Sequence, residues 1–354
     1  MNLAAVDKIA KAVLYEGYML YPYRPSSVKN QQRWNFGVLC PQSYSEAQNG
    51  TEAWTMQTEC LVEGDAETEV EVRVRFLQLT ERAVGELPTP ASELPSAYLP
   101  ESHAVGTTVV DGRAYQPWQE AVEREVVIPS CKVAALDRAP ILQEFRFPAE
   151  EETEALRESD DRIVGILLRK RNALSVEIEV RAVEREAGVF QLRVFIRNTT
   201  RFELANDATR DQALMSALVS THTVLGVQNG RFTSLIAPPE QFIELAARCK
   251  NVGTWPVLAG EEEKSDTLLS SPIILYDYPQ IAPESAGDLF DGTEIDEILS
   301  LRIMTLTDDE KREMSQSDER ARQMLERTEA MPAEQFMKLH GVLRSLRPVK
   351  EAAR

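Results

Sequence analysis

The densest group of chemically capable side chains is an acidic segment between residues 277 and 297. Carboxylate oxygens are the ligands that Mg²⁺ and Ca²⁺ prefer, so a cation site here would draw on Asp277, Asp288 and Asp291. Their spacing does not match an EF-hand loop, and a nearby helix start at Thr293 accounts for several of the other acids as first-turn carboxylates. The seven carboxylates of the segment are Asp277, Glu284, Asp288, Asp291, Glu294, Asp296 and Glu297.

A second segment interleaves aromatic rings with cations and is the basic region of an acidic chain. Its members are Tyr15, Tyr18, Tyr21, Tyr23, Arg24, Lys29, Arg33 and Trp34. Such rings stack on ligands or hold guanidinium groups, although tyrosines also anchor loops on a core with their hydroxyls in water. We interpret this segment, with Asp277, Glu284, Asp288 and Asp291, as partner-binding surface. The two segments can equally satisfy each other as opposite charges.

Imidazoles and thiols are scarce in this chain. Of the three histidines, His222 lies near a predicted strand and is the best candidate for catalysis or for metal binding beside the aspartates. The four cysteines, Cys40, Cys60, Cys131 and Cys249, form no close pair of the kind that holds zinc or an iron-sulfur cluster. We expect reduced, packed thiols and no cofactor, with transient binding of nickel or a cluster as the alternative.

Composition excludes several functional classes. The 354 residues carry a formal charge of -18, with 57 acidic against 39 basic side chains, which repels nucleic acid and anionic lipid surfaces. No apolar run is long enough to span a membrane, and the N-terminus lacks the pattern of a secretory signal, so a cytoplasmic location is expected. Motifs for phosphate loops, nucleophile elbows, zinc helices and dinucleotide binding do not occur in the sequence.

Hydrophobic periodicity predicts an α+β fold with an antiparallel, β-rich core, either a sandwich or a set of curled sheets. Apolar residues at helical spacing open the chain from Leu3 to Leu14, and alternation of period two dominates residues 35 to 235. Val70, Val72, Val74 and Phe76 are the clearest strand. Helical spacing returns after Pro239, and further helices are predicted at 294–303, 308–329 and 332–346.

Three local expectations concern connections between the strands. The Asn229-Gly230 dipeptide predicts a tight hairpin, because both residues accept positive φ. Residues 87–101 are predicted to form a surface loop, and the acidic residues 149–161 a linker or a short exposed helix. A soft boundary near residue 150 divides the chain into 1–150, with the N-terminal helix and first β unit, and 151–354. One integrated domain is the alternative.

Several strings resemble an uncharacterised bacterial family whose members are encoded beside nickel-iron uptake hydrogenases. They are Leu14-Tyr15-Glu16-Gly17-Tyr18, Leu20-Tyr21-Pro22-Tyr23-Arg24, Arg33-Trp34-Asn35-Phe36-Gly37, Gln57-Thr58-Glu59-Cys60-Leu61, Trp255-Pro256-Val257-Leu258, Leu269-Ser270-Ser271-Pro272, Pro283-Glu284-Ser285 and Asp291-Gly292-Thr293-Glu294-Ile295-Asp296-Glu297-Ile298-Leu299. The resemblance covers both ends of the chain and implies an accessory, assembly or stabilising factor of the hydrogenase system. It transfers no functional residue, and genomic neighbourhood is an associational argument.

These observations leave two main functional hypotheses. The first is a non-enzymatic cytoplasmic protein that binds a protein partner, a hydrogenase subunit or a maturation factor, without nucleic acid or membrane insertion. The second is a metal-dependent enzyme of the hydrolase type, with Asp277, Asp288, Asp291 and His222 around a cation. The oligomeric state is not determined by the sequence.

Overall fold

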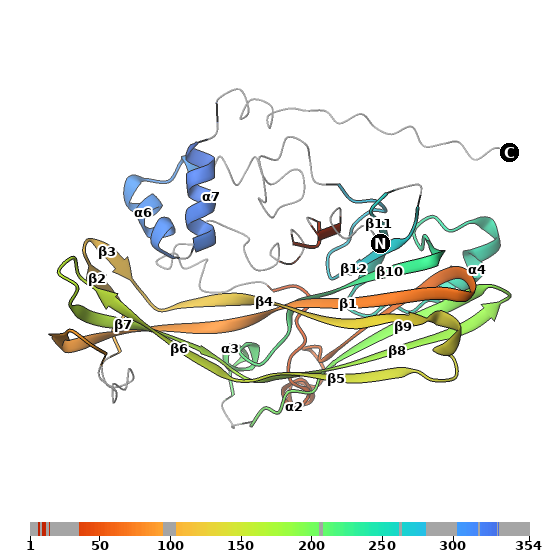
Figure 1. The fold of residues 1–354 in the computed structure, drawn as a ribbon, viewed down its shortest axis with the longest axis horizontal. Helices are drawn as coiled ribbons and strands as arrows, with labels where there is room; N and C mark the ends of the chain where they lie inside the picture. The colour runs from red at the N-terminus through yellow and green to blue at the C-terminus, as the bar shows by residue number, and fades with distance from the viewer. Residues whose placement is uncertain are drawn as a thin grey trace.

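A computed structural model describes most of the chain. The described residues are 6–7, 9–11, 14, 35–94, 104–204, 208–261, 264–280, 303–317, 319–330 and 332. The fold is α+β with a mostly antiparallel sheet at its centre, as the sequence predicts (Figure 1).

One very long strand organises this sheet. Strand β1 (Thr55–Ala91) has 37 residues and joins two of the predicted strands into one. Its side chains from Val70 to Phe76 alternate between buried valine or phenylalanine and partly exposed charged residues, because successive side chains of a strand point to opposite faces. The prediction for these residues is therefore confirmed, and the strand extends well beyond them.

The other strands pair along the two edges of β1, and every pairing is antiparallel. On one edge β1 pairs with β10 (Val219–Thr233) and then β7 (Ile163–Arg171); on the other it pairs with β9 (Val189–Asn198) and then β4 (Trp118–Lys132). The sheet continues from β10 to β12 (Thr267–Ser271) and β11 (Trp255–Ala259), from β9 to β8 (Leu174–Glu186) and β5 (Ile141–Phe147), and from β7 to β6 (Glu150–Arg157). A small hairpin of β2 (Thr108–Val110) and β3 (Arg113–Tyr115) is separate. Strands from both sides of residue 150 thus belong to one ten-stranded sheet.

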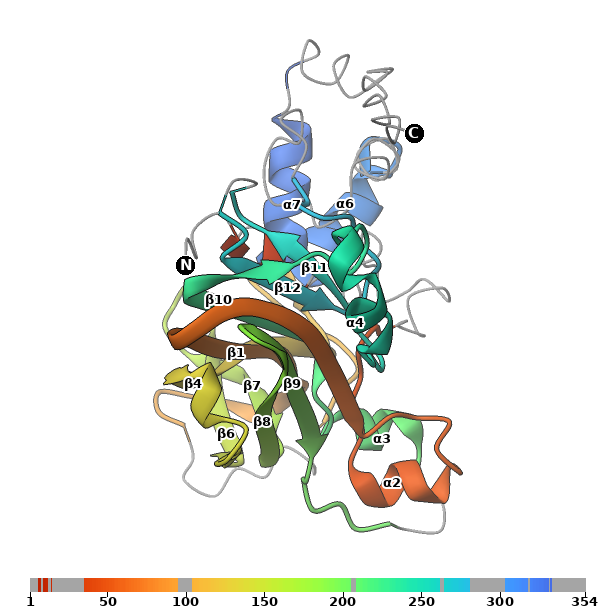
Figure 2. The ribbon, with the colours of Figure 1, turned by 90° about the vertical axis from the view of Figure 1, so that its right-hand side faces the viewer.

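The main hydrophobic core lies inside the curl of this sheet. Figure 2 shows β1 bending in an arc over β8 and β9. Buried residues of β1, β8 and β9 meet there, and Phe76 of β1 stacks edge-on against Phe147 of β5 with ring centroids 5.7 Å apart. The curled form of the predicted sheet is the one observed.

Helices cover the outer face of the sheet. The helical residues at positions 6–7, 9–11 and 14, called the N-terminal helix below, bury Val6 and Ala10 against β10, β11 and β12. Leu77 and Leu79 of β1 contribute to a second core with Leu14 of the N-terminal helix and with buried residues from four further helices. These helices are α2 (Gln42–Ala47), α3 (Arg210–Leu214), α6 (Asp308–Ser317) and α7 (Glu319–Glu329). The predicted helices at 3–14 and 308–329 are confirmed where described. Of the predicted helices at 294–303 and 332–346, the structure describes only residue 303, which is helical, and residue 332, which is not.

Near the far end of β10, the helical pair η4 (Glu240–Phe242) and α4 (Ile243–Arg248) follows Pro239 as predicted. Its buried residues Phe242 and Leu245 pack on Leu61 of β1. This places α4 beside one end of the sheet, next to β1 (Figure 1).

Three predicted connections were wrong. Asn229 and Gly230 do not form a hairpin, because residues on both sides of them pair with β1 and the dipeptide sits at a register shift inside β10. Residues 150–157 form strand β6 instead of a linker or helix, since Thr153 and its neighbours find hydrogen-bonding partners on β7. The predicted loop at residue 87 begins only after β1 ends at Ala91.

Candidate functional site

Most residues of the two predicted partner surfaces lie outside the described part of the chain. These are Tyr15, Tyr18, Tyr21, Tyr23, Arg24, Arg33 and Trp34 in the Tyr/Arg segment, and Glu284, Asp288 and Asp291 in the acidic segment. His222 and Asp277 are the sequence candidates whose surroundings the structure describes. Their geometry decides what each can do.

Asp277 closes the outer edge of β11. One carboxylate oxygen accepts a hydrogen bond from the Leu258 N–H at 2.8 Å, and the other accepts one from the Ser234 hydroxyl at 2.5 Å. The next residue, Tyr278, donates its N–H to the Leu258 carbonyl at 2.6 Å. Pro256 has no N–H to offer at the remaining outward position. Both Asp277 oxygens are therefore engaged in structural hydrogen bonds. The same contacts protect this edge of β11 from pairing with another chain.

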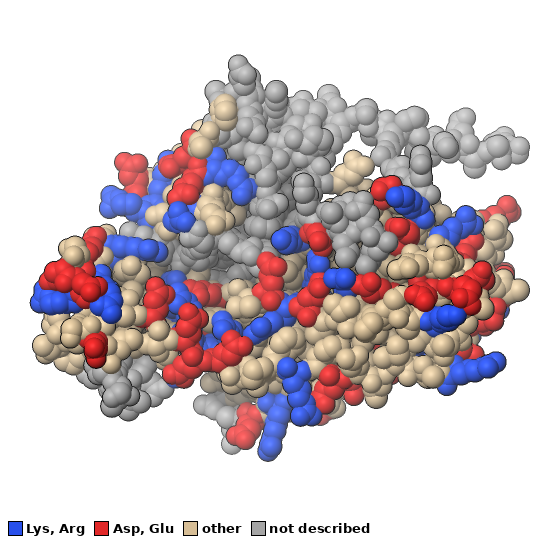
Figure 3. All heavy atoms as spheres, viewed as in Figure 1, with Lys and Arg blue, Asp and Glu red and all other residues tan. Residues whose placement is uncertain are grey.

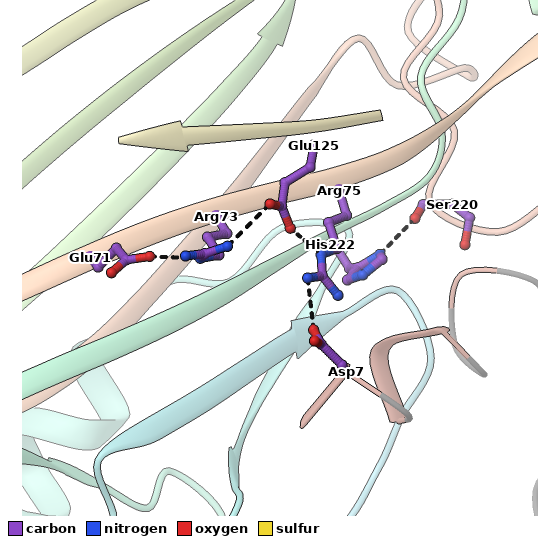
Figure 4. Close-up of polar contacts among 7 residues, drawn as sticks. All are labelled: Asp7, Glu71, Arg73, Arg75, Glu125, Ser220 and His222. Carbon is purple, nitrogen blue, oxygen red and sulfur yellow. Dashed lines mark hydrogen bonds and ion pairs between the residues drawn. The ribbon is translucent and has the colours of Figure 1, made fainter. Parts of the chain in front are cut away.

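His222 is fully buried on the outer face of β10, directly opposite Arg75 of β1. Its Nδ1 lies 3.0 Å from the Ser220 carbonyl, an acceptor, so Nδ1 carries the proton and Nε2 has a free lone pair (Figure 4). Among the described residues no group bonds to Nε2. Burial lowers the pKa of His222 to about 4, with the Arg75 charge acting in the same direction and the Ser220 hydrogen bond opposing. The imidazole is therefore neutral at pH 7 and a poor general base.

An ion cluster lies over His222. The Arg75 guanidinium donates to Glu125 of β4 at 2.5 Å and to Asp7 of the N-terminal helix at 2.8 Å (Figure 4). Glu125 also accepts from Arg73, which bonds Glu71 on the same strand. Burial alone would lower the pKa of Arg75, but its bonds to Glu125 and Asp7 outweigh burial and raise it. The guanidinium therefore stays charged and bound to two carboxylates.

The structure does not bring His222 and Asp277 together. Leu225 of β10 is aligned with Leu268 of β12 and then Leu258 of β11, and Asp277 lies beyond Leu258. Two strand spacings alone amount to about 10 Å, which exceeds the reach of ligands to one ion. Among the described residues, no three His, Cys, Asp or Glu side chains are placed to hold a metal.

The cysteines are placed as packed thiols. Burial raises the pKa of Cys40 to about 12 and that of Cys249 to about 12, and burial raises the pKa values of Cys60 and Cys131 as well. All four are free. Because the thiolate is the nucleophile and the metal ligand, these thiols are poorly suited to either role at neutral pH.

Sequence reasoning missed a charged strip on the inner face of the sheet. Beyond Phe76 the inward positions of β1 become polar, ending in Arg82. There Glu120 of β4 bonds Arg82 at 2.9 Å and Arg169 at 2.8 Å, and Glu150 of β6 is flanked in the same way by Arg124 and Arg171. Figure 3 shows basic and acidic side chains intermixed along the β4 and β6 side of the molecule. The signal was Gln78, Thr80 and Arg82 at the core-facing positions of a strand.

Half of the large hydrophobic side chains that are exposed in the described part of the chain come from the segment that contains α4, β11 and β12. Of the twelve large hydrophobic residues exposed in the described part of the chain, six lie between residues 236 and 276. They are Ile236, Ile243, Val252, Trp255, Ile274 and Tyr276, called the apolar end below. Tyr276 is 85% exposed and Trp255, the first residue of β11, is 45% exposed. Trp255 lies on β11 and Tyr276 follows β12, and exposed aromatic side chains of this size are enriched at binding surfaces.

Comparison of the chain with protein-family models, with curated proteins and with solved structures finds no match. Within the described helices, no segment has the length and apolar character required to span a membrane.

Proposed function

We propose that this chain is a non-enzymatic accessory or stabilising protein of a nickel-iron hydrogenase system that acts by binding a protein partner. The observation that carries the proposal is the coincidence of two features. Two strings behind the family resemblance, at residues 255–258 and 269–272, form most of the β11–β12 pair. That pair carries Trp255 and is followed by the exposed Ile274 and Tyr276.

The chemistry of the apolar end supports protein binding over small-molecule turnover. Trp and Tyr are enriched where interfaces gain most of their binding energy, because each contributes a large area with few rotatable bonds. The edge of β11 is already closed by Asp277, so a partner would contact side chains here and would not add a strand. A cytoplasmic location is part of the same proposal.

Affinity capture from the native host tests the proposal. The tagged full-length chain is expected to recover a hydrogenase subunit or maturation factor, and the double variant Trp255→Ser/Tyr276→Ser is expected to recover at least about tenfold less. Leu142→Ser is the matched control, because Leu142 is 62% exposed on β5 and lies away from the apolar end. Recovery of no hydrogenase component, together with unchanged hydrogenase activity after deletion of the gene, would refute the proposal.

A further inference from the structure

His222 is an unusual buried group because one of its nitrogens has no partner. The residue is 0% exposed, and its Nδ1–H donates a hydrogen bond to the Ser220 carbonyl. Its Nε2 has no hydrogen bond in the described part of the chain. A buried acceptor without a donor costs about 1–3 kcal/mol relative to the same group in water. Ser220 itself has φ 54°, a left-handed conformation that is strained for a residue other than glycine.

The described residues of the N-terminal helix lie on the same face of the sheet as His222. Val6 and Ala10 pack on Val224, two residues beyond His222 on the same face of β10. Asp7 extends from the same helix to the Arg75 guanidinium, which is the cross-strand neighbour of His222. The Asp7 carboxylate is 42% exposed, so the ion pair lies at the rim of the contact. Its net contribution is correspondingly small.

From this geometry we infer that the N-terminal helix is a proton-sensitive cover, and that protonation of His222 favours the state in which the helix has left the sheet. In the covered state a proton on Nε2 would be buried beside the cationic Arg75 with no acceptor. With the helix removed, water reaches Nε2 and solvates the imidazolium. Arg75 then keeps its bond to Glu125 and loses Asp7.

The charged groups facing His222 act in both directions. Arg75 of β1 opposes protonation, whereas Glu123 and Glu125 of β4 favour it. Asp7 is the acid that the N-terminal helix brings to the cluster. Thr223 is aligned with Ser270 of β12, so the residue next to His222 on β12 is Ser271, which is uncharged. Desolvation outweighs the carboxylates, and it is the contribution that departure of the helix removes.

The direction of the pH effect follows from linkage. The pKa of His222 is about 4 under the cover, against 6.5 for the ordinary group. A base whose pKa is depressed in the covered state stabilises that state above pH 6.5 and loses this stabilisation as the pH falls toward 4. If the open state restores the ordinary pKa, opening increases by up to about 70-fold between pH 7.5 and pH 4.5.

Amide hydrogen exchange of residues 6–14 in the full-length chain measures this opening. The wild-type chain is compared with His222→Gln at pH 7.5 and pH 4.5, each normalised to the unfolded chain at the same pH. Because the variant keeps Asp7, Glu123 and Glu125, titration of those acids cancels in the comparison. The wild type is expected to show the additional increase, up to about 70-fold, and the variant to lack it. Equal increases in both chains would overturn the inference.

Two further measurements keep the test decisive. Amides of β8 report global unfolding. They should retain protection at pH 4.5 while residues 6–14 lose it. Simultaneous loss of protection in both segments of the wild type would overturn the inference, and this readout does not depend on whether His222→Gln folds.

Asp7→Asn removes the charged contact but leaves His222 intact. This variant is expected to open more than the wild type at pH 7.5 and still to show a larger pH-dependent increase than Asp7→Asn/His222→Gln, and equal increases in these two variants would count against His222 as the sensor.

Discussion

At the scale of single residues, the sequence candidates for catalysis or metal binding form structural hydrogen bonds where the structure describes them. Asp277 holds a backbone N–H of β11, and His222 donates to a backbone carbonyl. A carboxylate cannot serve a metal and an N–H with the same oxygen at full strength. The metal-enzyme hypothesis therefore receives no support from these two residues.

Replacement of Asp277 tests the structural role. Asp277→Ala removes the acceptor of the Leu258 N–H, and Leu258 is buried, so the unpaired donor should lower the free energy of unfolding by about 1–3 kcal/mol. Asp277→Asn keeps a side-chain oxygen and should cost less. Chemical denaturation measures both variants. Equal stability of Asp277→Ala and the wild type would show that the edge contact contributes nothing.

At the scale of elements, the most consequential difference from the sequence prediction is the continuity of β10 through Asn229 and Gly230. The dipeptide does adopt a special conformation, since Asn229 has φ 54°. It does so within a bend of one strand, where the paired strand β1 also shifts register between Gly64 and Glu69. Local turn chemistry was therefore recognised correctly, but its use was decided by pairing with β1 on both sides.

Gly230 should be intolerant of a side chain for this reason. A Cβ at Gly230 would lie 2.7 Å from the Glu63 carbonyl oxygen, so Gly230→Ala should lower the free energy of unfolding by about 1–3 kcal/mol. Gly106→Ala is the control, because a Cβ there meets nothing within 4 Å. Urea denaturation of both variants gives the comparison. A loss no larger in Gly230→Ala than in Gly106→Ala would indicate that the bend relaxes freely.

At the scale of the whole molecule, β1 connects all parts of the sheet. It pairs with β9 and β10 in its first half and with β4 and β7 in its second half. The main core and the charged strip lie on the same inner face of this one strand. If β1 unfolds locally, strands that pair with its first half and strands that pair with its second half therefore both lose hydrogen-bonding partners.

We expect the two halves to unfold in one cooperative transition. Phe76→Ala opens a cavity at the centre of β1 and should lower the free energy of unfolding by about 3–5 kcal/mol. Hydrogen exchange in increasing denaturant should show β7 and β8 amides shifting together by the same amount. Separate transitions for the two strands would instead favour independent units on either side of residue 150.

The sequence by itself determined the alternation of β1, the helices at both ends and the β-rich class, because burial of one face imposes a period that is visible in Val70 to Phe76 and in Val6 to Leu14. Only the tertiary structure decided that β6 is a strand, that His222 lies beneath Arg75 and Asp7, and that Asp277 closes an edge. Each of these depends on partners between 6 and 147 residues away in the chain. The hydrophobic period of a segment does not specify such pairings, because a strand edge or a charged group can pair with many others. The tertiary structure determines which partner is adjacent.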